Sequence, residues 1–222
     1  MLGACRAFPV FREGAMRYEE DDMANARKTI HKATRRSLLD ADPPRHLRDD
    51  IDTLIPHSGL SARQVADMVL PREDRLWILL FACGLPDRLC LVFARICALR
   101  CLPFWLIPHP GVVVRYLRTG KKVLAREARG FLLPILGDAE RAATWAATVP
   151  FFEGDSLDMV LRRWTRVSAP YRAWAAAASA RKAGISGEDQ IADLLFVMDT
   201  HPTVLSLRIS GRHFDALPTG EA

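Results

Sequence analysis

Residues 86–102 read PDRLCLVFARICALRCL and decide the fold of this chain. Apolar side chains recur along them at helical spacing in two adjacent stripes, formed by Leu89, Val92, Phe93, Ile96 and Leu99 and by Cys90, Ala94, Cys97 and Cys101. Arg88 and Arg95, a heptad apart, leave only a thin polar seam. A helix that is apolar around most of its circumference is normally a central one. We therefore expect residues 86–102 to form the central helix of an all-α protein, an irregular multi-helix globular bundle.

The chain on either side of this stretch also carries helix signals. Residues 19–40 begin with acidic residues and carry Lys32, Arg35 and Arg36 near their end, which matches the helix macrodipole at both ends. Ser61 is suited to the N-cap of a helix over residues 62–70, and Pro71 to the start of the next helix. Pro170 is suited to the start of an alanine-rich helix, and Ser186 to the N-cap of the helix after it. Helix is thus the expected structure of most of the chain.

Two segments are less clearly helical. Residues 111–118 contain three consecutive valines and fit either a helix or a short strand. Leu205, Leu207 and Ile209 alternate with polar residues, which predicts a short C-terminal strand.

The length of 222 residues fits one domain with one substantial core. We expect a single helical domain over residues 19–214, followed by a tail over residues 215–222. Met16 stands just before the first predicted helix and is a second candidate start. Residues 1–18 are therefore predicted to form a disordered N-terminal extension.

The charge pattern gives only a weak indication of a partner. The net charge is +5, and only five of the 31 basic residues are lysine, a bias typical of genomes with high GC content. Arginine abundance is therefore discounted as a sign of nucleic-acid binding. The basic residues also look spread along the chain, which predicts no more than a preference for an acidic partner.

The most apolar stretch, residues 76–107, does not fit a membrane span. It contains Asp87, Arg88, Arg95 and Arg100, and each charge at the centre of a bilayer costs about 2.5–3.5 kcal/mol on insertion scales. We predict a pair of core helices there instead.

Four of the five cysteines fall within 19 residues, namely Cys83, Cys90, Cys97 and Cys101. Helical spacing suits buried, reduced thiols better than a secreted disulfide framework, which predicts a cytoplasmic protein. Cys97 and Cys101 share a helix face, but a zinc site needs two further ligands from elsewhere. Structural thiols are favoured, and metal binding stays open.

The usual signatures of catalysis are missing from the sequence. There is no Gly-x-Ser-x-Gly elbow and no His-Glu-x-x-His pair. Lys121 and Lys122 follow Gly120, but Arg115 stands where a phosphate-binding loop needs its first glycine. We assign no catalytic, cofactor-binding or metal-binding residue, and expect no cofactor. An enzyme with a site assembled from distant residues is kept as a third hypothesis.

Residues 60–66, LSARQVA, resemble the first helix of a helix-turn-helix. Leu70 and Pro71 stand where that motif has its glycine turn, and residues 77–80 are too apolar to lie in a DNA groove. A DNA-associated regulator that uses residues 60–80, or the basic residues 27–36, is our second hypothesis.

A family resemblance runs through residues 73–102. The segments EDRLWILL at 73–80, Leu-Pro at 85–86, Phe-Ala at 93–94 and CALRCL at 97–102 resemble a group of helical bacterial proteins, some labelled immunity proteins. The chain departs from that pattern at Arg95 and at Leu99, where the pattern has glutamate. The resemblance implies a helical protein that acts by binding another protein, and it supplies no catalytic residue.

Our first hypothesis is accordingly a non-enzymatic helical protein that binds a protein partner, of the immunity or toxin-neutralising type. Arg95 and Arg100 are the residues singled out for it, because charges on the most apolar helix must be exposed, paired or functional. Pairing with an acidic residue elsewhere in the core is the expected outcome.

Overall fold

A computed structural model describes residues 32–105, 111–121, 123–124, 127–128, 131, 137–146 and 168–200. Every regular element of this part is helical, so the all-α prediction is confirmed. The elements are α2 (Arg35–Asp40), α3 (Arg45–Asp49), α4 (Ile51–Leu54), α5 (Ala62–Ala66), α6 (Arg72–Trp77), the π-helix η1 (Ile78–Ala82), α7 (Asp87–Arg100), the 3-10 turn η2 (Leu102–Phe104), α8 (Gly111–Thr119), α10 (Asp138–Ala146), α12 (Ala169–Lys182) and α13 (Gly187–Asp199).

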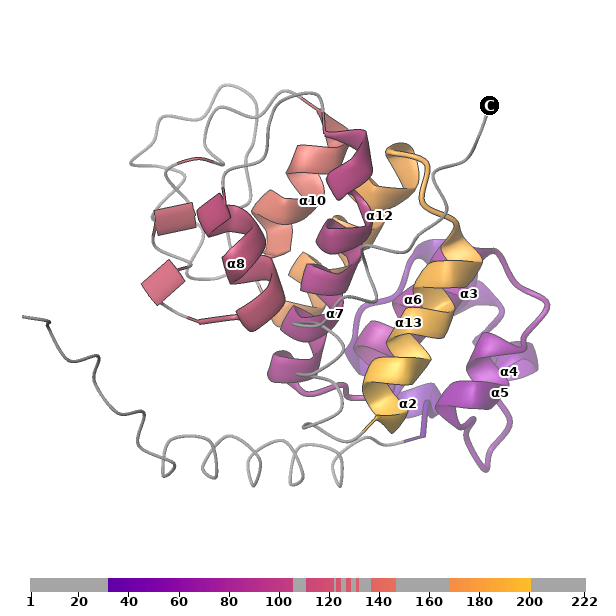
Figure 1. Cartoon of the computed structure of the whole chain (residues 1–222). Coiled ribbons are helices and arrows are strands. Elements are labelled where there is room, and N and C mark those ends of the chain that lie inside the picture. The colour runs from indigo at the N-terminus through magenta and orange to yellow at the C-terminus, as the bar shows by residue number, and fades with distance from the viewer. Residues whose placement is uncertain are drawn as a thin grey trace, which may run out of the picture.

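The predicted central helix is α7. It packs against α8, α10, α12 and α13, so it has neighbours on most of its circumference (Figure 1). Leu89, Phe93 and Cys97 are completely buried, which agrees with the two apolar stripes in its sequence. The helix therefore holds two groups of elements together: α8, α10 and α12 on one side, and α13 with α2–α6 on the other.

The N-terminal group is built around α6 and its continuation. Leu76, Leu79 and Leu80 are completely buried, as their helical spacing predicts. The Trp77 ring stacks on the Phe81 ring with their centroids 4.9 Å apart. The helix α13 lies over this group and contacts α5, α6 and α7.

Most of the predicted helix starts are confirmed. Ser61 and Gln64 form a reciprocal capping box at the start of α5, and the Ser186 hydroxyl accepts a hydrogen bond from the Glu188 amide at the start of α13. Pro170 lies in the first turn of α12. The valine-rich segment that fitted helix or strand is the helix α8, whose Tyr116 hydroxyl donates to the Ala146 carbonyl at 2.9 Å.

The prediction of one continuous helix over residues 19–40 is wrong at its C-terminal end. Residues 32–34 are not helical, because the Ala33 amide and carbonyl each pair with the backbone of Leu60 at 2.8 Å. Thr34 then caps a new helix, α2, through a capping box with Ser37. Local periodicity missed this break because the pairing partner lies 27 residues away.

One shorter helix also differs from its predicted extent. The helix expected over residues 62–70 ends at Ala66.

Several expectations concern residues outside the described ones. They are the N-terminal extension over residues 1–18, the basic residues 27–31, the C-terminal strand around 205–209 and the tail over 215–222. Among the described helices, none combines the length and apolarity needed to cross a membrane.

Candidate binding surface

Arg100, in the last turn of α7, is paired as expected. Its Nη2 lies 2.8 Å from Oδ1 of Asp193 on α13, and its Nε bonds the other carboxylate oxygen. The two side chains are 19% and 14% exposed. The bond to Asp193 raises the pKa of Arg100, while burial raises the pKa of the Asp193 carboxyl. Arg100 therefore joins two helices of the fold.

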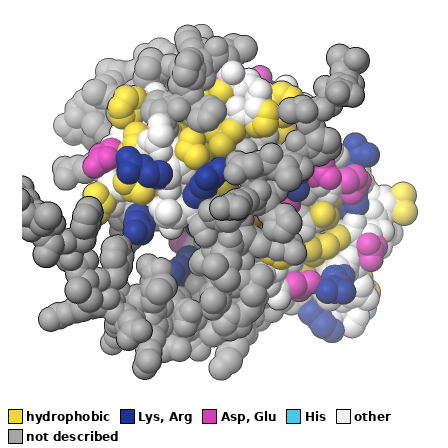
Figure 2. Space-filling model, viewed as in Figure 1, with side chains coloured by type: hydrophobic (Ala, Val, Ile, Leu, Met, Phe, Trp, Pro, Cys, Tyr) yellow, Lys and Arg dark blue, Asp and Glu magenta, His cyan; other side chains and the backbone are white. Residues whose placement is uncertain are grey.

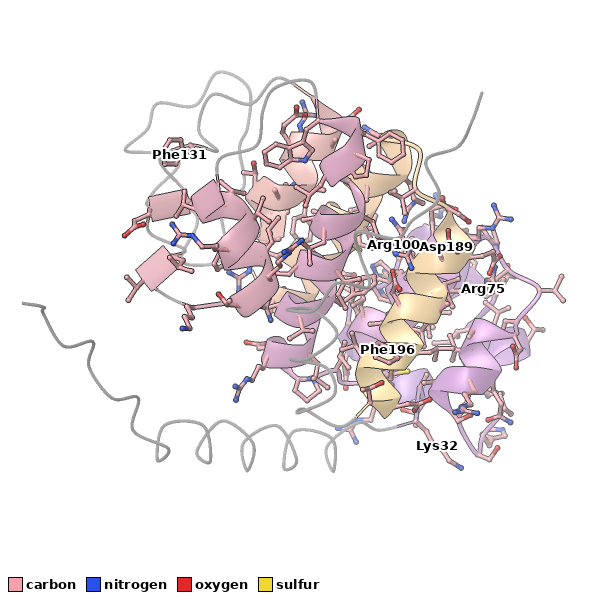
Figure 3. The ribbon with its side chains drawn as sticks, in the orientation of Figure 1. Lys32, Arg75, Arg100, Phe131, Asp189 and Phe196 are labelled. Carbon is pink, nitrogen blue, oxygen red and sulfur yellow. The ribbon has the colours of Figure 1, made fainter. Side chains whose placement is uncertain are left out.

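Other arginines are held around α13 in the same way. The helix carries acidic residues and no basic one, and Arg72 and Arg75 of α6 contact its Glu188 at 2.8 and 2.6 Å. These two arginines lower the pKa of Glu188. Arg75, Arg100 and the neighbouring Asp189 gather near the start of α13 (Figure 3). The positive charge on this side of the molecule is thus largely matched by carboxylates of the chain itself.

Arg95 has different surroundings from Arg100. It lies five residues earlier on α7, and its guanidinium lies against Gly120, directly after α8. The two arginines chosen from the sequence therefore belong to different sides of the central helix: Arg100 faces α13 and Arg95 faces α8.

Arg95 is part of a surface on which basic side chains gather. We call this surface the α7–α8 cationic face and define it by Arg88, Arg95, Arg115, Arg118 and Lys121. Figure 2 shows several dark blue side chains, with a magenta one beside them, on the side of the molecule where Figure 1 has α8. Arg115 and Lys121 are exposed, and the other three are half-buried.

Exposed apolar side chains occur in the segment that follows α8. Val123 is 74% exposed and Phe131 is 55% exposed. Phe131 lies on the same side of the molecule as α8 in Figure 3. The surface thus combines arginine with apolar and aromatic side chains.

The sequence contains a signal for this face that the distribution of basic residues alone does not reveal. Between Asp87 and Glu127 the chain contains no acidic residue, while its basic residues are Arg88, Arg95, Arg100, Arg115, Arg118, Lys121, Lys122 and Arg126. Basic residues looked evenly spread over the whole chain, but the acidic residues are not. Because α7 and α8 pack together, cations of this acid-free run can share a surface, although Arg100 of the same run faces α13.

The four described cysteines are buried and free, as predicted. Burial raises the pKa of Cys83 to about 11 and those of Cys90 and Cys101 to about 12, so these thiols stay protonated at neutral pH. Within the described ranges, no group of three or more metal-ligating side chains comes together.

The helix-turn-helix-like segment enters the core at its C-terminal end. Ile78, Leu79 and Leu80 are completely buried, so the second of its two helices is part of the core. One contact of this region was not predicted from the sequence. Nε2 of His46 on α3 lies 2.9 Å from Oδ1 of the buried Asp74 on α6.

The chain matches no known family model, no curated protein and no solved structure. A functional assignment therefore depends on the chain's own residues. Among those described, the residues of the α7–α8 cationic face form the candidate binding surface.

Proposed function

We propose that this chain is a non-enzymatic helical protein that binds an acidic protein partner through the α7–α8 cationic face. The observation that carries the proposal is the gathering of basic side chains on two packed helices whose sequence contains no acidic residue between Asp87 and Glu127. A stoichiometric complex of the toxin-neutralising or immunity type is the form of binding that the resemblance in residues 73–102 implies.

Charge supports an acidic partner. Clustered cations raise the local positive potential and steer an oppositely charged protein during encounter. The face differs from other described parts of the surface in its sequence, because its helices α7 and α8 lie, apart from the first residue of α7, in a run without acidic residues over residues 88–126. Other parts contain residues of both signs, such as Arg35 with Asp52 at 2.7 Å and Arg63 with Asp199 at 2.8 Å.

The apolar side chains at the edge of the face favour a protein over a nucleic acid. Interface centres are enriched in arginine and aromatic residues, and a few such residues carry most of the binding free energy. Phe131 and Val123 supply exposed apolar area in the segment that follows α8. Nucleic-acid binding through the same cations is the competing outcome of the experiment below.

A cytoplasmic location belongs to the proposal. The four described cysteines are free thiols and not disulfides, which fits a reducing compartment.

The test begins with affinity purification of the tagged chain from its native host at moderate salt, with and without nuclease. A double charge reversal, Arg115→Glu with Arg118→Glu, is purified in parallel. The matched control is Arg36→Glu with Arg45→Glu, which makes the same charge change on α2 and α3, at side chains 92% and 94% exposed. Figure 1 places α2 and α3 on the opposite side of the molecule from α8.

We expect one acidic protein to be recovered in a stoichiometric complex that survives nuclease. The double reversal on α8 is expected to lower the affinity of this complex at least about tenfold, because charges at the edge of an interface speed association and closely paired charges slow dissociation. The control variant is expected to keep the affinity within about twofold of the wild type. Equal loss in both variants refutes the role of this face. If every partner is lost on nuclease treatment and affinity falls steeply with salt, the partner is a nucleic acid and not a protein.

A further inference from the structure

The contact between Arg95 and Gly120 is unusually close. A Cβ atom built at Gly120 lies 2.1 Å from Nη1 of Arg95 and 2.6 Å from its Cζ, so a side chain at this position would displace the guanidinium. Gly120 also has φ +66°, in the left-handed region that side chains other than glycine rarely adopt. The backbone conformation thus favours glycine at this position, and the missing side chain lets the guanidinium lie against the backbone.

This glycine ends α8. Its amide donates to the Tyr116 carbonyl at 2.7 Å, and the Thr119 hydroxyl donates to the Arg115 carbonyl at 2.7 Å. The C-terminal end of a helix carries partial negative charge, which cations nearby stabilise. The Arg95 guanidinium, held on the central helix α7, lies directly against this end.

Arg95 is less accessible than Arg115 and Lys121. Its Nη1 is buried, whereas Arg115 and Lys121 are exposed. The side chain thus extends from a rigid core helix to the end of α8, beneath the surface that the exposed cations form.

We propose that Arg95 is the positioning residue of the α7–α8 cationic face. It fixes the C-terminal end of α8 against α7 and so presents Arg115, Arg118 and Lys121 in one arrangement to the partner, without contacting the partner itself. This inference rests on the proposed function. Its structural half, the anchoring of α8, is measurable in the free protein.

Three variants separate position from charge. Arg95→Met removes the charge and keeps an apolar stem, while Arg95→Lys keeps the charge and removes the planar guanidinium that lies on Gly120. Arg88→Met removes the other cation of the same seam, one heptad earlier on α7, and is the matched control for the anchoring of α8. Thermal unfolding of each variant checks that the core remains folded.

The first readout is amide hydrogen exchange of the full chain. We expect exchange of the Thr119 and Gly120 amides to become at least about tenfold faster in both Arg95 variants, with no change in the amides at the centre of α7. In Arg88→Met, exchange at Thr119 and Gly120 stays at the wild-type rate. Wild-type exchange at these amides in Arg95→Met overturns the inference, and so does a uniform loss of protection across α7, α10 and α12.

The second readout is affinity for the captured acidic protein. Both Arg95 variants are expected to bind about tenfold more weakly, because binding requires the arrangement of α8 that the Arg95 guanidinium fixes and not only the charge of residue 95. Full recovery of affinity in Arg95→Lys overturns the positioning role. If the wild-type chain captures no acidic protein, the proposed function fails, yet the exchange measurement still decides whether Arg95 anchors α8.

Discussion

Replacement of Arg100 by methionine tests how strongly α7 is joined to α13. Methionine keeps the length of the apolar stem but leaves the carboxylate of Asp193 without the two bonds that Arg100 donates, one of them 2.8 Å long. Asp193 is then a charge at 14% exposure without its guanidinium.

The expected cost follows from that burial. Removing one partner of a buried ion pair destabilises a protein by about 3–5 kcal/mol, and the residual exposure of both side chains places this pair at the lower end, about 3 kcal/mol. For a chain of this size that corresponds to a fall in Tm of roughly 6–12 °C. The double variant Arg100→Met with Asp193→Leu removes the stranded charge and is expected to lie within about 1 kcal/mol of the wild type.

The penalty also depends on pH in a defined direction. Burial raises the pKa of Asp193, and loss of Arg100 removes the neighbour that opposes this rise. A carboxyl with a raised pKa in the folded state favours folding when it is protonated. The cost of Arg100→Met is therefore largest above the folded-state pKa of Asp193 and shrinks as the pH falls through it.

Urea unfolding at neutral and at mildly acidic pH measures these effects as changes in the free energy of unfolding. The control is Arg36→Met, which breaks an exposed pair with Asp40 of 3.7 Å and is expected to change stability by no more than about 0.5 kcal/mol. A loss below about 1 kcal/mol for Arg100→Met, or a double variant less stable than the single one, contradicts the reasoning.

Two further results are expected. Gly59→Ala forces a side chain onto φ +71° with its Cβ 2.9 Å from the Ala33 carbonyl oxygen, so we expect the free energy of unfolding in urea to fall by about 2 kcal/mol. Gly184→Ala, at φ +103° with no atom within 4 Å, is the control and should cost only about 1 kcal/mol. Equal losses would show that the contact with Ala33 is unimportant. Ellman's reagent at pH 8 should label the four described cysteines slowly in the native chain and fully in the urea-unfolded chain: Cys83, Cys90, Cys97 and Cys101. Fast labelling of any of these four in the native chain would contradict their burial.

Features encoded by neighbouring residues were predicted well. The apolar stripes of α7 identify a core helix from its own sequence, because a side chain that recurs every three or four residues lies on one face of a helix. Ser61 and Ser186 mark helix starts for an equally local reason: each hydroxyl accepts from an amide two or three residues later. These interactions need no knowledge of the rest of the chain.

Features that depend on distant residues were not predicted. The break before α2 arises from the pairing of Ala33 with Leu60, and no pattern in residues 19–40 indicates it. The need for a partner at Arg100 followed from its apolar neighbours, but Asp193, 93 residues away, was not identifiable. The cationic face lies between these cases, since its acid-free run is visible in the sequence while the packing of α8 on α7 is not.

The sequence alone thus determined that this chain is helical, which helix is central and where several helices start, because periodicity and capping act over three or four residues. Only the tertiary structure decided that Arg100 belongs to the core through Asp193 and that Arg95 lies at the end of α8 against Gly120. Both arginines stand on one apolar helix, and nothing local distinguishes them. The helices that pack on opposite sides of α7 determine that one charge meets a carboxylate inside the fold and the other lies beneath the proposed binding surface.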